Sequence, residues 1–112
     1  MDNSILNTIK KMLGLSEDYV AFDADIIVHI NSALMSVQQL GIGPTAGMAI
    51  SDSSATWGSL LGDRENLEAV KSFIYIKVRL VFDPPSSSFV LQALKEDANE
   101  LEWRLREQAE DN

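Results

Sequence analysis

The stretch "KVRLVFDPPSSSFVLQALKED", residues 77–97, joins two apolar runs through a corner. Pro84 and Pro85 cannot continue a helix from the residues before them, because proline lacks a backbone N–H and clashes with the preceding turn. Asp83 is pushed towards an extended conformation by the proline that follows it. One of the serines at 86–88 can then cap a new helix. The stretch therefore predicts a helical hairpin with a hinge at Asp83, Pro84 and Pro85.

The segment before the hinge has two competing patterns. Residues 74–80 alternate between apolar and polar or aromatic side chains, as a strand does. Apolar residues at helical spacing, however, continue back to Leu67, which is too long a run for one strand. We therefore predict a helix over 64–82, capped by Asp63, and expect it to be the most buried helix because apolar residues surround most of its girth. Lys77 falls inside its apolar stripe, where its stem can pack while the ammonium reaches solvent.

The segment after the hinge predicts a long helix over 87–109. Its apolar stripe consists of Val90, Leu94, Ala98, Leu101 and Leu105. At 1.5 Å per residue such a helix is roughly 35 Å long. We expect its acidic C-terminal end to project beyond the rest of the bundle.

The N-terminal half predicts two further helices and a loop. A helix over 4–13 is capped by Ser4 or Asn3 and stopped by Gly14, and a helix over 24–40 has Asp23 as its cap. Residues 41–62 hold several glycines, a proline and many hydroxyl side chains, and they predict a long irregular loop with a short strand at 48–50 and one helical turn at 56–61. The fold class is thus all-α, a small bundle of about four helices in a single domain over 1–112.

Composition limits the classes of function. The chain has 112 residues, no cysteine and a net charge of -8, so a disulfide or zinc–thiolate framework is excluded and tight binding of nucleic acid by the whole domain is disfavoured. Residues 16–68 carry eight acids and one Arg, residues 69–95 four bases and one acid, and residues 96–112 seven acids and two Args. Such opposite segments suit pairing within the chain or between subunits. We see no signal peptide and no apolar run long enough to span a membrane.

No catalytic, cofactor-binding or metal-binding motif stands out. His29 is the only histidine and has no partner at a known catalytic spacing. The "DAD" at 23–25 would need a glycine at position 28 and a glutamate at position 34 to form an EF-hand loop, and those positions hold Val28 and Leu34. The "GIGPTAG" at 41–47 lacks the strand and helix of a dinucleotide fingerprint. We therefore expect a protein without enzymatic activity.

Several side chains are better candidates for contacts with a partner. Trp103 lies opposite the apolar stripe of its helix, among charged residues that include Arg104 and Arg106, so it is either an interface anchor or a ring folded flat over its own helix. Val28 and Met35 form a small apolar strip on the back of the 24–40 helix. Trp57, in the loop, completes this set of interface candidates.

With those residues in view, the chain resembles the head–tail connector (adaptor) proteins of tailed phages and prophages. The matching pieces are "FDADIIVHINSALMSVQQLGIG" at 22–43, "TW" at 56–57, "LEAVKSFIYIKVRLVFDPPSSSFVLQALKE" at 67–96 and "EWRL" at 102–105. The resemblance implies a structural protein of the virion neck, assembled in the host cytoplasm. It implies a ring, usually dodecameric, that docks beneath the portal protein, extends the DNA channel and receives a stopper or tail-completion protein. It implies no cofactor and no membrane, and an acidic lining suits DNA that must slide without binding.

Two other interpretations remain open at this point. An acidic protein of this size could mimic DNA and bind a basic host protein, although the positive segment 69–95 interrupts its acids. A small hydrolase built around His29 has almost no support in the sequence.

Overall fold

The computed structural model describes residues 4–43, 47–61 and 67–110. Within them the chain forms five helices: α1 (Ile5–Met12), α2 (Asp23–Gln39), α3 (Trp57–Leu61), α4 (Leu67–Phe82) and α5 (Ser88–Glu110). No strand occurs in this part of the chain, which confirms the all-α class, and residues 73–82 are helical as the longer apolar pattern predicts. The predicted short strand at 48–50 is wrong, whereas the predicted helical turn near 56–61 is α3. The Asp63 cap lies outside the described residues.

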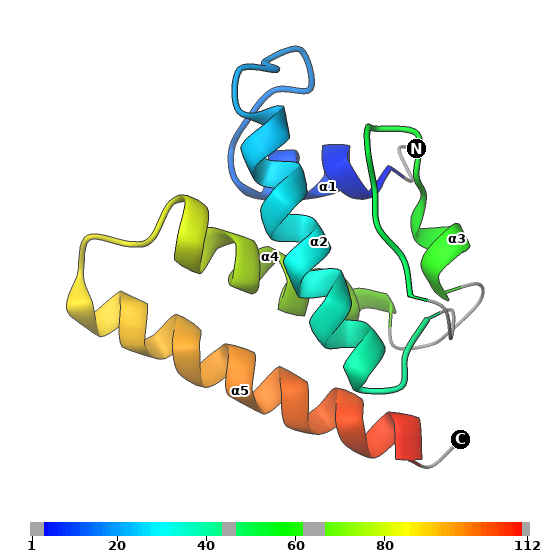
Figure 1. Cartoon of the computed structure of the whole chain (residues 1–112). Coiled ribbons are helices and arrows are strands. Elements are labelled where there is room, and N and C mark those ends of the chain that lie inside the picture. Colours follow the sequence, from blue (N-terminus) through cyan, green and yellow to red (C-terminus); the bar gives the residue numbers. More distant parts are fainter. Residues whose placement is uncertain (1–3, 44–46, 62–66, 111–112) are drawn as a thin grey trace.

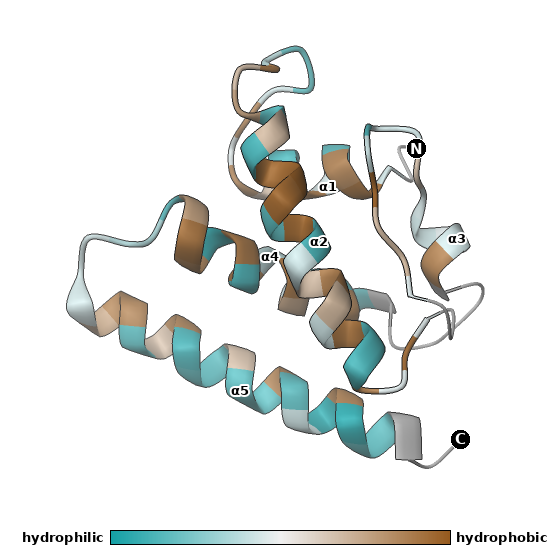
Figure 2. Cartoon of the chain, in the orientation of Figure 1, coloured by the Kyte–Doolittle hydropathy of each residue, from teal (hydrophilic) through white to brown (hydrophobic). Residues whose placement is uncertain are grey.

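The central helix is α4. Helices α2 and α5 pack on different sides of it, and α1 contacts both α2 and α4 (Figure 1). Apolar residues cover much of α4 and α2, whereas α5 is predominantly hydrophilic along its exposed face (Figure 2). The core therefore lies where α1, α2 and α4 meet, and Val70, Phe73, Ile74 and Val78 of α4 are all buried in it. Lys77 is not part of this core: it is exposed, with Nζ 5.9 Å from the centre of the Phe73 ring.

The N-terminal helix has local signals at both ends. The Ser4 hydroxyl accepts a hydrogen bond from the Asn7 backbone N–H at 3.2 Å, the ordinary geometry of an N-cap. At the other end Gly14 has a φ of +85°, and the Leu15 N–H donates to the Lys10 carbonyl at 2.8 Å. A left-handed glycine satisfies the last carbonyls of a helix in this way. The predicted stop at Gly14 is thus confirmed.

The start of α2 differs from the prediction. Asp23 does not cap the helix but is its first residue, and its Oδ1 lies 2.9 Å from Lys10 Nζ. Lys10 is only 1% exposed, and its Nζ also donates to the Glu17 carbonyl at 3.0 Å. Asp23 Oδ1 has no hydrogen bond of regular geometry, so the lysine is its compensating charge. An ion pair between the buried Lys10 and the partly buried Asp23 therefore links α1 to the start of α2. The sequence had predicted a helix cap at Asp23.

Hydrogen bonds attach the segment that follows α2 to the helices at two points. Asn31 of α2 accepts a hydrogen bond from the Ile50 N–H at 2.7 Å through Oδ1 and donates from Nδ2 to the Ile50 carbonyl at 3.0 Å. Ile50 is buried. Further on, the Ile5 N–H donates to the Ala55 carbonyl at 3.0 Å. We call residues 47–56 the strap, because this irregular segment runs across the bundle and is fixed to both α1 and α2.

The hairpin has the predicted corner but a different offset. Ser87 caps α5, with the Val90 N–H 3.4 Å from its hydroxyl oxygen. Ile76 of α4 lies level with Asp97 and Leu101 of α5. Counting along antiparallel helices from that level, α4 ends opposite Ala93, so the first turn of α5 projects beyond it. It is thus the N-terminal end of α5 that projects; at the acidic end, Leu105 is fully buried.

Candidate interaction surfaces

The described residues contain no group of three or more side chains that could hold a metal ion. Within the same residues, no helix is long and apolar enough to cross a membrane. His29 is half-buried on α2. The features that call for a functional explanation are therefore surfaces on which apolar side chains remain in water.

The outer face of α2 is one such surface. Val28 and Met35 are 63% and 61% exposed. They are seven residues apart, so they lie on one face, about 10 Å from each other. Ile26, Ile30, Ala33 and Val37 occupy the other face of the helix and are buried. The strip predicted from the sequence thus has no cover within the described chain.

The outer face of α5 is another. Trp103 is 60% exposed, so most of its side chain is in contact with solvent. Arg104 and Arg106 are exposed beside it, and Arg104 Nη2 lies 2.7 Å from Glu100 Oε1. The Trp103 side chain therefore offers a large apolar surface framed by charges, the usual setting of an interface anchor.

Trp57, the remaining interface candidate, is buried at the start of α3. It is 3% exposed, and its indole Nε1–H donates to the Thr8 hydroxyl at 3.0 Å. The Lys71 ammonium lies 5.6 Å from the centre of its ring. This placement gives Trp57 a role in fastening α3 to α1, and contact with a partner would require α3 to move.

The hinge region leaves apolar side chains exposed. The last helical bond of α4 runs from the Asp83 N–H to the Arg79 carbonyl at 3.0 Å, and Pro84 and Pro85 follow. Val90, expected in the core stripe, is 41% exposed, and Phe89 is 83% exposed. Both belong to the turn of α5 that projects past α4. Sequence reasoning missed Phe89, although an aromatic residue in the first turn of a helix and off its apolar stripe is a usable signal.

An aromatic cluster packs against the C-terminal end of α4, next to the hinge. The rings of Phe22 and Phe82 meet edge to face at 5.6 Å, and Tyr19 meets Phe22 at 5.7 Å. Such contacts stabilise by about 1 kcal/mol each beyond the area they bury. These contacts hold the C-terminal end of α4, directly before the hinge, against the start of α2.

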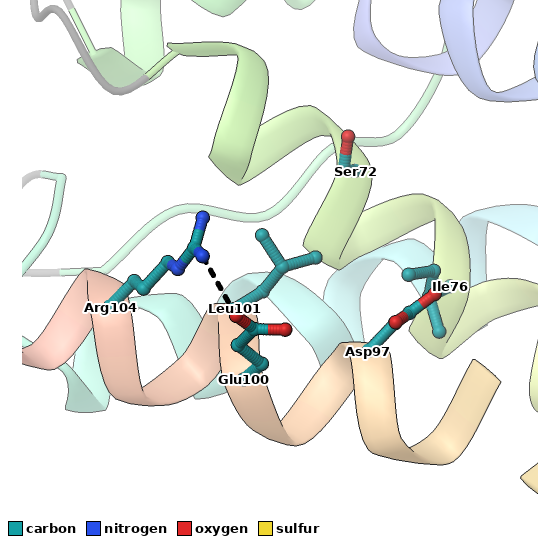
Figure 3. Close-up of a pocket in the computed structure, with 6 residues that line it drawn as sticks. All are labelled: Ser72, Ile76, Asp97, Glu100, Leu101 and Arg104. Atoms are coloured by element: carbon teal, nitrogen blue, oxygen red, sulfur yellow. Dashed lines mark hydrogen bonds and ion pairs between the residues drawn. The ribbon is translucent and has the colours of Figure 1, made fainter. Parts of the chain in front are cut away.

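A groove runs between α4 and α5 (Figure 3). Its volume is about 310 Å³, and it is lined by Ser72, Ile76, Asp97, Glu100, Leu101 and Arg104. Arg104 turns towards Glu100 and forms the ion pair described above, whereas Asp97 has no hydrogen bond or ion pair among the described residues. We call this the acidic groove. Sequence reasoning did not find it, because it depends on the register between two helices.

Comparison with known proteins gives one family. A family model described as phage connector protein matches residues 5–112 of the chain. Searches of curated proteins and of solved structures find no significant match. The match includes every helix described above and the hinge.

Proposed function

Because the chain belongs to the phage connector protein family, we propose that it assembles with copies of itself into a ring beneath the capsid portal. Membership in the family makes the chain a structural component of the phage neck. The dodecameric ring, the extended DNA channel and the docking of a stopper or tail-completion protein are the finer parts of the proposal. Assembly in the host cytoplasm belongs to it as well.

The arrangement of exposed side chains supports a subunit with several neighbours. Val28 and Met35 face outward from α2, and Trp103 faces outward from α5. Because α2 and α5 pack on different sides of α4, these surfaces point in different directions (Figure 1). A ring subunit needs two different surfaces for its neighbours and others for the portal and the stopper. We assign Trp103, with Arg104 and Arg106, to the portal or to a neighbouring subunit.

The hinge and the net charge fit the same role. The bend at Asp83, Pro84 and Pro85 holds the angle between α4 and α5, so α5 keeps a fixed direction in every copy. The net charge of -8 repels phosphate, which suits a passage through which DNA slides without binding. No enzymatic step forms part of this proposal.

The experiment is attachment of the purified chain to capsids that carry the portal but lack this protein. We expect Trp103→Ala to weaken attachment by about 30-fold or more, because truncating an interface anchor commonly costs 2 kcal/mol or more. The helical circular dichroism should stay unchanged, since the side chain is largely in solvent. Val20→Ala is the matched control, because Val20 is 65% exposed in the α1–α2 loop. Attachment of Trp103→Ala at the wild-type level would remove this residue from the interface.

A further inference from the structure

The two flanks of the α4–α5 hairpin carry opposite charge. One flank is the acidic groove, where Asp97 stands without a charged partner among the described residues beside the apolar side chains of Ile76 and Leu101. Around α5, Lys95 lies about 200° from Asp97, and around α4, Lys77 lies about 140° from Ser72. Because the helices are antiparallel, both lysines fall on the flank opposite the groove. We call this the basic flank.

The basic flank is also unpartnered. Lys77 and Lys95 are exposed and form no ion pair within the described residues. Lys77 rests over the Phe73 ring, which limits the positions of its ammonium. One turn further along α4, Val81 is 62% exposed. The flank therefore carries two cations and an uncovered aliphatic side chain, and no ion pair within the described residues balances the two lysines.

The other charged groups on these flanks do not change the difference in charge between the acidic groove and the basic flank. Glu102 and Arg106 lie on the side of the basic flank, further towards the C-terminal end of α5, and they offset each other. In the acidic groove, Arg104 is paired with Glu100. On the groove side of α4, Arg79 lies about 20° from Ser72 around the helix. Arg79 donates to the Tyr75 hydroxyl at 3.0 Å, and Asp83, four residues further along the same side, carries the opposite charge. The charges that remain unbalanced are Asp97 on one side and the two lysines on the other.

We propose that the basic flank of one copy binds the acidic groove of the next, with Lys77 and Lys95 facing Asp97 and Val81 packing against the half-buried Leu101. The occupant of the groove is thus a second copy of this chain, and the inference rests on the ring proposed above. Two different surfaces on opposite flanks make a head-to-tail contact, which forms a ring where the repeated rotations add up to one full turn. Complementary charge sets the orientation of such a contact and excludes mismatched pairings.

Charge reversal tests this pairing directly. Asp97→Lys makes both flanks basic, and Lys77→Glu with Lys95→Glu makes both acidic. We expect each variant alone to need at least a tenfold higher concentration for self-association than the wild type, because like charges meet at every contact. Mixed in equal amounts, the two variants should associate again, in alternation, since each basic surface then meets an acidic one. Combining all three substitutions in one chain should restore self-association of that chain.

Sedimentation velocity at several protein and salt concentrations measures these outcomes. Asp18→Lys and Lys11→Glu are the controls, since both residues are exposed, lie away from the hairpin and undergo the same charge changes. Reversed variants that assemble like the wild type, or a mixture that stays dissociated, would overturn the flank pairing while leaving the ring intact. A wild-type chain that forms no ring either alone or on portal-bearing capsids would overturn the ring and the pairing together.

Discussion

Replacing Lys10 with Ala is expected to lower the free energy of unfolding by about 3 kcal/mol, because removal of one partner leaves the other charge of a largely buried ion pair uncompensated. The Lys10 side chain is 1% exposed, and its Nζ lies 2.9 Å from Asp23 Oδ1. The same ammonium holds the Glu17 carbonyl, so the substitution also releases the loop between α1 and α2. The Asp23 side chain is 26% exposed, which keeps the loss below that of a fully buried pair.

Urea unfolding followed by circular dichroism measures this loss. Lys11→Ala is the matched control: Lys11 is the next residue, is exposed, and should change stability by no more than about 0.5 kcal/mol. Lys10→Met separates packing from charge, since it keeps an unbranched stem and removes only the ammonium. Combining Lys10→Met with Asp23→Asn should recover part of the loss, because no charge is then left alone. Equal stabilities for Lys10→Ala and Lys11→Ala would contradict the role of the ion pair.

The second large effect concerns the attachment of α5. We expect Leu105→Ala to cost about 3 kcal/mol, the typical loss for a large-to-small substitution in a packed core. Leu105 is fully buried and belongs to the main core, whereas Leu94 and Leu101 on the same stripe are only half-buried. One fully buried leucine thus holds the C-terminal half of the helix against the bundle.

Leu94→Ala is the matched control for this substitution. It removes the same atoms from the same stripe at a half-exposed position, so we expect about 1 kcal/mol. Thermal unfolding by calorimetry ranks the two variants. Hydrogen exchange of the α5 amides adds a local measurement, in which Leu105→Ala should lower protection along the C-terminal half of the helix. Identical losses for the two leucines would show that α5 is held evenly along its length.

Local patterns predicted most of the helical architecture. Residues 73–82 were predicted as a helix because the apolar pattern is too long for one strand, and the length of that pattern can be read directly from the sequence. The prolines at 84 and 85 and Gly14 act through backbone geometry, and the serine cap acts through a hydrogen bond to a residue three positions away. None of these effects depends on distant residues. The exposure of Val28, Met35 and Trp103 also followed from helical periodicity.

The remaining features depend on contacts between distant residues. Aspartate is a common helix cap, but the partner of Asp23 is Lys10, thirteen positions earlier. Sequence patterns that consider only neighbouring residues do not predict such a pair. The exposure of Val90 and the acidic groove follow from the offset between α4 and α5, which depends on how the two helices pack. The strap was predicted as an irregular loop, but its attachment through Asn31 to Ile50 has no sequence signature.

The measurement that tests the central claim most directly is electron cryomicroscopy of portal-bearing capsids incubated with the purified chain. We predict a closed ring of identical subunits beneath the portal, with a central passage for DNA and with each α4–α5 hairpin contacting its neighbours through opposite flanks. Capsids whose portals stay bare, or a chain bound only as isolated copies or two-fold dimers, would contradict a ring-forming neck component.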